Sequence, residues 1–189
     1  GVELLSRILN WDDRNTCVLF GDAAGAMILG TSESDDRGIL STHIHTDGKY
    51  ANILTIPGGG SIHPINAETI EKKLNFVHMN GREVYKFAVR SLSQVVREAL
   101  EANQMTTEQV DHVVPHQANI RIVDAVLKNL KVPREKTVIN IDRYGNTSSA
   151  SVPVTLDEAV REGRIKEGDM VVMMAIGAGM SWGSAMIRW

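Results

Sequence analysis

The stretch VDHVVPHQANIRIVDAVLKNL, residues 110–130, decides the fold class. Its first five residues, 110–114, form an apolar run of strand length that ends at Pro115 and His116. Over residues 118–130 the apolar positions then recur at intervals of three and four, which is the period of an amphipathic helix. A strand that leads directly into a helix is the repeating unit of an α/β protein. The sequence therefore predicts an α/β fold with a tight connection at His116.

The same alternation of strand and helix patterns continues on both sides of this stretch. Residues 82–103 give the strongest helix pattern, with Asn80 as the expected N-cap. Four further runs have the length and composition of strands, and the alternation favours a mainly parallel sheet. We expect strands at 38–46, 137–141, 169–175 and 184–189, the start of a short helix or turn at 106–109, a helix at 152–162, a closing glycine at Gly163 and a glycine-rich turn at 176–183.

Two apolar runs near the start are separated by Gly21 and Asp22, within TCVLFGDAAGAMILG at residues 16–30. Each run has the length of a strand, so we expect two neighbouring buried strands joined by a tight turn. Glycines inside such strands indicate close packing of backbone segments. The single cysteine, Cys17, falls in the first run and is expected to be buried. A polar break follows at residues 31–37.

Composition sets bounds on the class of protein. The chain has 189 residues, 43% of them apolar, which is ordinary for a globular protein with one good core. A net charge of −3 gives no reason to expect nucleic acid, and no apolar stretch approaches the roughly 20 residues of a membrane span. One cysteine cannot form an internal disulfide, which favours a reducing, cytoplasmic location. His63 and His78 lack metal-ligand spacing, so no metal site is expected.

Two polar residues follow expected strands at the sheet edge where α/β proteins bind ligands. His116 follows the strand 110–114, and Asn146 follows the strand 137–141 within DRYGNTSSAS. Taken singly, the histidine fits a satisfied structural role, and the asparagine fits a turn. Taken together, an imidazole and an amide can both donate to one carbonyl oxygen and stabilise an enolate. Asparagine cannot act as a base, so the pair suits carbanion stabilisation better than hydrolysis.

Longer motifs carry a family resemblance. VPHQANIRI at 114–122, DRYGNTSSASVPVTLDEA at 142–159 and GAGMSWGSAMIRW at 177–189 resemble the second half of β-ketoacyl-acyl-carrier-protein synthase III, a thiolase-fold condensing enzyme. The resemblance covers essentially the whole chain. It implies an α/β, thiolase-like fold with αβαβα layers. Residues 1–36 would be the tail of the first half, with its last strands, and residues 37–189 would be the second half.

The resemblance also implies an activity, the decarboxylative Claisen condensation of acetyl-CoA or another short acyl-CoA with malonyl-acyl-carrier protein at the start of fatty acid synthesis. Members use a Cys-His-Asn triad, in which His116 and Asn146 match the histidine and the asparagine, whereas elongating condensing enzymes use two histidines. The nucleophile of the family lies upstream of Gly1, and its role is not transferred to Cys17. This chain alone is therefore expected to be inactive.

Other positions match the family one by one. The backbone amide of Ala178 matches an oxyanion position, and Arg14 matches the arginine that packs on the adenine of coenzyme A. Gly81 and Asn119 match pantetheine contacts, Phe20 and Ile176 match the acyl pocket, and Lys86, Arg121 and Lys128 match residues that meet the carrier protein. The expected partners are acyl carrier protein, acyl-CoA and a second copy in a homodimer, with the coenzyme A thioester as substrate and no cofactor.

Three alternatives stay open from the sequence. The stripe Arg82, Lys86 and Arg90 on the expected helix fits a solvated face by pattern alone, and a docking patch by resemblance. The chain as a whole could belong to a related thiolase-fold acyltransferase of secondary metabolism, with the same site residues and another acyl pocket. It could also be a non-catalytic fragment that binds carrier protein or coenzyme A.

Overall fold

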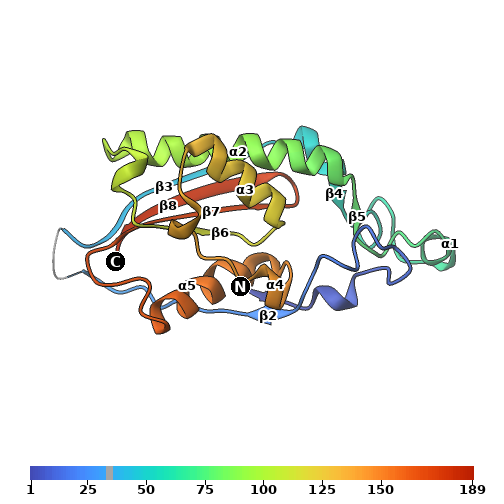
Figure 1. Ribbon diagram of the computed structural model, residues 1–189. Helices are drawn as coiled ribbons and strands as arrows, with labels where there is room; N and C mark the ends of the chain where they lie inside the picture. The colour runs from blue at the N-terminus through green and yellow to red at the C-terminus, as the bar shows by residue number, and fades with distance from the viewer. Residues whose placement is uncertain (33–35) are drawn as a thin grey trace.

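The computed structural model describes residues 1–32 and 36–189, and its centre is a four-stranded sheet between two layers of helices (Figure 1). The sheet has the order β3-β8-β7-β6, formed by Gly38–Thr46, Ser181–Arg188, Met170–Gly177 and His112–Pro115. The longer helices are α2 (Gly81–Ala102), α3 (Ile120–Leu130) and α5 (Ser151–Arg161). The shorter elements are β1 (Val2–Glu3), β2 (Ala23–Ala24), β4 (Leu54–Thr55), β5 (His78–Met79), α1 (Ala67–Glu71), α4 (Ile141–Tyr144) and the 3₁₀ turns Leu5–Arg7, Gly48–Ile53, Thr107–Gln109, Arg134–Lys136 and Ser148–Ala150.

The prediction of a mainly parallel sheet is wrong. Only β6 and β7 pair in parallel within this sheet, whereas β7 with β8 and β3 with β8 pair antiparallel. The turn between β7 and β8 is much tighter than the expected 176–183, because β7 runs to Gly177 and β8 starts at Ser181. A connection of three residues can only join antiparallel neighbours, so the hairpin reverses the chain direction at this point.

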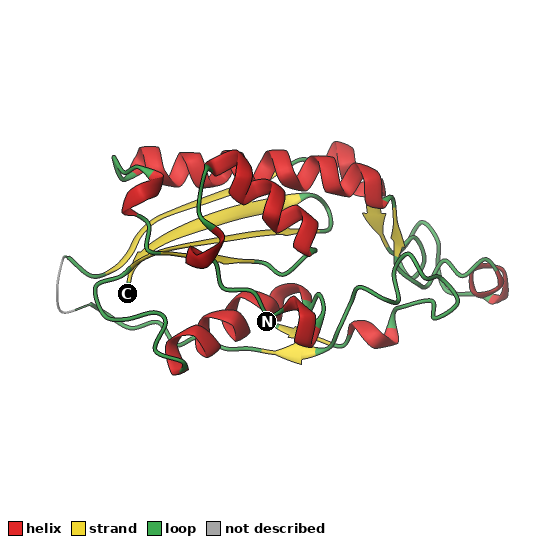
Figure 2. Ribbon diagram, viewed as in Figure 1, coloured by secondary structure: helices red, strands yellow, loops and turns green. Residues whose placement is uncertain are grey.

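Helices α2 and α3 cover one face of the sheet, as Figure 2 shows. Asn80 is the N-cap of α2, as predicted, and its side chain accepts a hydrogen bond from the N–H of Glu83. Apolar positions at helical spacing on both helices are buried against β6, β7 and β8, and they make the larger core. The other face of α2 is exposed and charged. Across the described residues, no helix combines the length and the apolar character that a membrane crossing needs.

A second, smaller core lies between α5 and the opposite face of the sheet. Leu156 and Ala159 of α5 pack there with Val114 and Val171 of the two parallel strands. The helix was expected at 152–162, and Gly163 follows it with a φ of +69°, which suits glycine. The segment that carries Asn146 leads directly into this helix, so the packing of α5 fixes its position.

The strand expected at 137–141 does not form. Only Thr137 bridges to Val113, after which the chain turns at Asn140 and enters α4. The backbone carbonyl of Val138 accepts a hydrogen bond from the side chain of Gln117 at 3.2 Å. A buried side-chain amide therefore takes the place of part of the strand ladder, which the β-branched composition of this run could not reveal.

The two buried strands expected within 16–30 are also absent. Residues Ala23–Ala24 form a short strand with β1, and Met27, Ile28 and Leu29 are 51%, 99% and 76% exposed. Cys17 is only half-buried and lies in a series of turns. An apolar run is buried as a strand only where neighbours cover it, and no such neighbour covers this run within the described residues. Of the polar break at 31–37, residues 33–35 lie outside the described part.

Candidate active site

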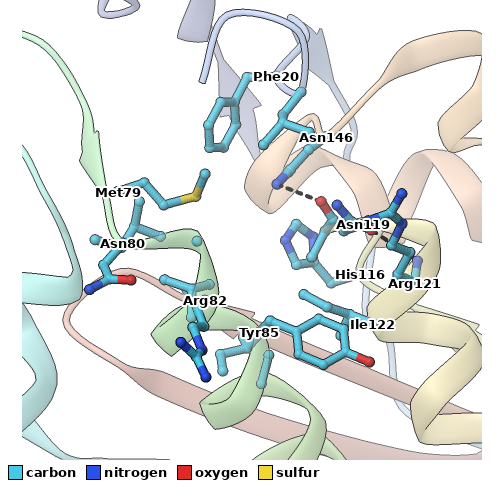
Figure 3. A pocket seen from close by; sticks show the side chains of 18 of the residues that line it. Phe20, Met79, Asn80, Arg82, Tyr85, His116, Asn119, Arg121, Ile122 and Asn146 are labelled. Atoms are coloured by element: carbon cyan, nitrogen blue, oxygen red, sulfur yellow. Dashed lines mark hydrogen bonds between the residues drawn. The ribbon is translucent and has the colours of Figure 1, made fainter. Parts of the chain in front are cut away.

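A cavity of about 1040 Å³ opens between the start of α2, the start of α3 and the segment that carries Asn146 (Figure 3). It also borders on β4, β5 and the β7–β8 hairpin. His116 and Asn146 both line this cavity although 30 positions separate them. The two residues that the sequence singles out are therefore brought to one site.

His116 is fixed at the end of β6. Its backbone N–H donates to the carbonyl of Met174 at 2.7 Å, which continues the pairing with β7. Its ring Nδ1 lies 2.6 Å from Oγ of Ser151 at the start of α5, and the residue is 8% exposed. Backbone and ring are thus held by two different elements, so the ring has little freedom to move within the site.

Burial lowers the pKa of His116 from its ordinary value of 6.5 to about 4. The cause is the loss of hydration, which disfavours the charged imidazolium. A hydrogen bond with the backbone of Ser148 and the charge of Glu3 act in the opposite direction and are outweighed. At neutral pH the ring is therefore uncharged, and it carries a single proton that it can donate.

This lowered pKa predicts a loss of stability in acid. Between about pH 6.5 and about pH 4 the unfolded chain binds a proton at His116 that the folded chain does not bind, so folding weakens as the pH falls. The shift in pKa corresponds to a difference of about 3 kcal/mol in the free energy of unfolding. Urea unfolding at pH 7 and pH 4 checks this, with His116→Gln as the variant that cannot titrate. We expect the wild type to lose about 3 kcal/mol more than His116→Gln, and equal losses would contradict the assignment.

The sequence predicted that a strand at 137–141 would position Asn146. In the structure, the backbone of Asn146 is instead bonded to the N-terminal segment. Its N–H donates to the carbonyl of Leu19 at 2.8 Å, and its carbonyl accepts from the N–H of Gly21 at 2.9 Å. The side-chain Oδ1 accepts from the N–H of Ser148 at 2.9 Å, and Nδ2 donates to the carbonyl of Ala118 at 3.3 Å. An amide nitrogen has two protons, so one remains for a ligand in the cavity.

Two glycines make this backbone approach possible. A Cβ on Gly21 would lie 2.1 Å from the carbonyl oxygen of Tyr144, a distance that no side chain tolerates. Gly145 has a φ of +70° and a ψ of −162°, a region that is open essentially to glycine alone. The close backbone packing that the sequence GDAAGA predicted is confirmed at Gly21, and it places Phe20 beside Asn146.

The other predicted site residues divide into two groups. Five of them line the cavity together with His116 and Asn146: Phe20, Gly81, Asn119, Arg121 and Ile176. Four others are exposed and lie outside the lining: Arg14, Lys86, Lys128 and Ala178. Arg14 precedes the lining residue Asn15, and Ala178 follows the lining residue Gly177. Cys17 is not among the lining residues either.

The positively charged side chains in and near the cavity differ in how free they are to bind a ligand. Arg82 and Arg121 line the cavity from the first turns of α2 and α3, and both are exposed. Lys86 is paired with Glu83 at 2.9 Å, and the guanidinium of Arg90 lies over the ring of Phe87 at 5.4 Å. The stripe on α2 is therefore exposed as expected, but its middle charge is partly compensated.

Sequence reasoning missed several residues of the site. Ser151 contacts the ring of His116 across 35 positions, and nothing local in SSAS distinguishes this serine from its neighbours. The remaining lining residues come partly from the expected helices 82–103 and 118–130 and partly from segments outside these helices. They are Asn15, Leu19, Leu54, Met79, Asn80, Val84, Tyr85, Ala88, Ala118, Ile122, Gly177 and Met180.

Family models match both ends of the chain. The model described as "3-Oxoacyl-[acyl-carrier-protein (ACP)] synthase III C terminal" matches residues 100–189. The model described as "3-Oxoacyl-[acyl-carrier-protein (ACP)] synthase III" matches residues 1–48. The first match contains His116 and Asn146, and the second contains the segment that supports Asn146.

Curated relatives are similar over the whole chain. A beta-ketoacyl-[acyl-carrier-protein] synthase III of Symbiobacterium thermophilum is 51% identical over 189 residues, which is 100% of this chain and 57% of that protein. One of Acidiphilium cryptum is 53% identical over 190 residues, with the same coverage of both chains. The chain thus spans somewhat more than half the length of the relatives it matches.

Solved structures are similar in fold. The 3-oxoacyl-[acyl-carrier-protein] synthase III of Aquifex aeolicus VF5 matches with a TM-score of 0.84 and 40% identity, over 100% of this chain and 56% of that chain. The priming β-ketosynthase of the R1128 polyketide pathway matches with a TM-score of 0.80 and 30% identity, over 98% and 55%. The expected α/β, thiolase-like fold class is thereby confirmed.

Proposed function

The chain belongs to the 3-oxoacyl-[acyl-carrier-protein] synthase III family, and from that premise we propose that it supplies the carbanion-stabilising part of a condensing active site. The observation that supports this most is the meeting of His116 and Asn146 in one cavity. One is an uncharged donor and the other an amide donor, so both are suited to an oxygen that becomes negative.

The proposed reaction begins with malonyl-acyl-carrier protein. The bond between the α-carbon and the carboxylate breaks, carbon dioxide leaves, and the electron pair moves onto the thioester carbonyl oxygen as an enolate. N–H groups of His116 and Asn146 donate to that oxygen. The enolate carbon then attacks an acyl group held as a thioester on a cysteine, whose sulfur leaves as thiolate. By family resemblance this cysteine lies upstream of residue 1.

The proposal includes partners and location. The substrates are an acyl-CoA, taken as the coenzyme A thioester, and malonyl-acyl-carrier protein, with no additional cofactor. Ala178 would contribute a backbone N–H, Arg14 would meet the adenine, and Lys86, Arg121 and Lys128 would meet the carrier protein. The complete enzyme would act as a cytoplasmic homodimer. These assignments rest on the family resemblance.

An assay of the complete protein that contains this chain tests the function. Malonyl-acyl-carrier protein and acetyl-CoA are supplied together, and the β-ketoacyl product is measured. We expect product from the complete protein and none from residues 1–189 alone. Absence of product from the complete protein, with acetyl-CoA and with longer primers, would contradict the proposal.

Reversal of charge at Arg121 is expected to weaken the use of malonyl-carrier protein more than the use of acyl-CoA. Arg121 is exposed at the rim of the cavity, where an acidic carrier would meet it, and steering of this kind acts mainly on association. KM for each substrate is compared between Arg121→Glu and the control Arg161→Glu, which lies on α5 outside the cavity lining. Equal effects of Arg121→Glu on both substrates would count against the docking role.

A second candidate is a related acyltransferase with the same site and a different primer. The similarity to the R1128 priming ketosynthase supports it, because that protein shares 30% identity over nearly the whole chain. Primer choice would depend on the half-buried side chains Phe20 and Ile176, which line the cavity. A comparison of acetyl-CoA with longer and branched primers in the same assay distinguishes the two candidates.

A further inference from the structure

Ser151 connects the first turn of α5 to the ring of His116. Its Oγ lies 2.6 Å from Nδ1 of that ring, and the residue is 2% exposed. The contact is therefore short and shielded from water. The family resemblance implies no role for Ser151, whereas His116 is central to the proposed chemistry.

The serine hydroxyl makes a second contact. The backbone N–H of Gln117 donates to Oγ at 3.3 Å and occupies one of its lone pairs. The hydroxyl has one proton to donate, and among the described residues Nδ1 of His116 is the only acceptor in contact with it. This arrangement leaves the hydroxyl proton available for donation to Nδ1.

Gln117 is itself held rigidly. Its Nε2 donates to the carbonyls of Pro115 and Val138 at 3.0 and 3.2 Å, and its Oε1 accepts from the N–H of Asn140 at 3.2 Å. The residue is 1% exposed. Because both polar atoms of this buried side chain are bonded, the backbone N–H of Gln117 is held in place. Its contact with Oγ of Ser151 is therefore maintained.

We propose that Ser151 is a positioning residue that holds His116 in the tautomer with its proton on Nε2. When Nδ1 accepts the serine proton, the single ring proton of the uncharged imidazole must reside on Nε2, where it can be donated to the enolate. The inference rests on the proposed function for its catalytic meaning, although the tautomer itself is independent of that function. The backbone of Ser148 is the other polar group at the ring, and it is left as the alternative partner when the hydroxyl is removed.

The tautomer can be observed directly by ¹⁵N NMR of the complete protein, labelled in its histidine rings and measured at neutral pH. The signals of His116 are identified by their absence in His116→Gln. The variants are Ser151→Ala, which removes the hydroxyl, and Ser151→Thr, which retains it. Ser93→Ala is the matched control, because Ser93 is also buried in a helix and makes two hydrogen bonds, to Val89 and Asn129.

We expect a protonated Nε2 and a bare Nδ1 in the wild type, in Ser151→Thr and in Ser93→Ala. In Ser151→Ala the population of the Nδ1–H form should rise about tenfold, the factor that one hydrogen bond of ordinary net strength sets on such an equilibrium. The kcat for decarboxylation should fall in proportion to the loss of the Nε2–H population, with an unchanged KM, because fewer molecules present the donor.

Two results would overturn the inference: an Nδ1–H tautomer in the wild type, or a Ser151→Ala spectrum identical to that of the wild type. A complete protein with the expected tautomer response but without any β-ketoacyl product would support the inference and contradict the proposed function. Because the spectrum needs no turnover, the two failures are distinguishable.

Discussion

Replacement of His116 with alanine is expected to slow the decarboxylation of malonyl-carrier protein by the complete enzyme by a factor on the order of 10²–10³. The variant loses a preorganised donor aimed at the oxygen that becomes negative. A water molecule in its place would lack the fixed orientation that burial and the contact with Ser151 give to the ring. Release of carbon dioxide from the malonyl thioester at saturating substrate measures the effect.

A matched control separates this effect from general damage to the fold. His112 lies four positions earlier at the start of β6, is paired with Asp169 at 3.2 Å and does not line the cavity. His112→Ala should keep decarboxylation within a few-fold of the wild type. If His116→Ala kept full activity, the histidine would have no place in the mechanism.

Substitution of Asn146 is expected to have an effect of similar size, on the order of 10²–10³ for Asn146→Ala. Asn146→Asp is the sharper variant. It retains an oxygen for the N–H of Ser148, which keeps the loop anchored, but it removes the amide donor and places a negative charge beside the enolate. Decarboxylation by Asn146→Asp should therefore be at least as slow as by Asn146→Ala.

Asn103→Asp serves as the control for this substitution. The Nδ2 of Asn103 donates to Ser41 and to the carbonyl of Ala99, both at 2.7 Å, at a place remote from the cavity lining. It loses comparable hydrogen bonds without touching the site, so its decarboxylation rate should stay near that of the wild type. An Asn146→Asp variant as active as Asn103→Asp would show that donation by the amide is not required.

Local patterns predicted those elements whose formation depends on one buried face. Helices α2 and α3 appear close to the expected bounds, because their apolar positions repeat at helical spacing and face the sheet. Strand β3 matches the expected residues 38–46 for the same kind of reason, an alternation of exposed and more buried side chains. These signals lie within the segment itself, so no knowledge of its neighbours is needed.

Other elements depended on partners that the sequence does not name. Residues 137–141 have strand composition, but Gln117 takes one of their backbone carbonyls and the chain leaves the sheet. The apolar residues 27–29 are exposed, since burial requires a covering neighbour as well as an apolar side chain. The predicted strand direction was wrong because β7 and β8 form a tight hairpin, and because β3 pairs with β8 across more than 130 positions.

In the candidate site, too, some residues could be predicted from the local sequence and others depended on contacts with distant segments. His116 and Asn146 could be predicted because the motifs around them are long and resemble a family. Their convergence in one cavity then depended on backbone contacts with Leu19 and Gly21. Ser151 could not be predicted, because its contact with the histidine ring arises only when α5 packs beside β6.

His116 and Asn146 are proposed to act on one oxygen as a pair, which a double-mutant cycle on the decarboxylation rate can show. Rates are measured for the complete wild-type enzyme, His116→Ala, Asn146→Ala and the double variant. We expect the double variant to be about as slow as the slower single variant, because either loss disables the same oxyanion site. Effects that multiply, with each loss acting independently of the other, would contradict it.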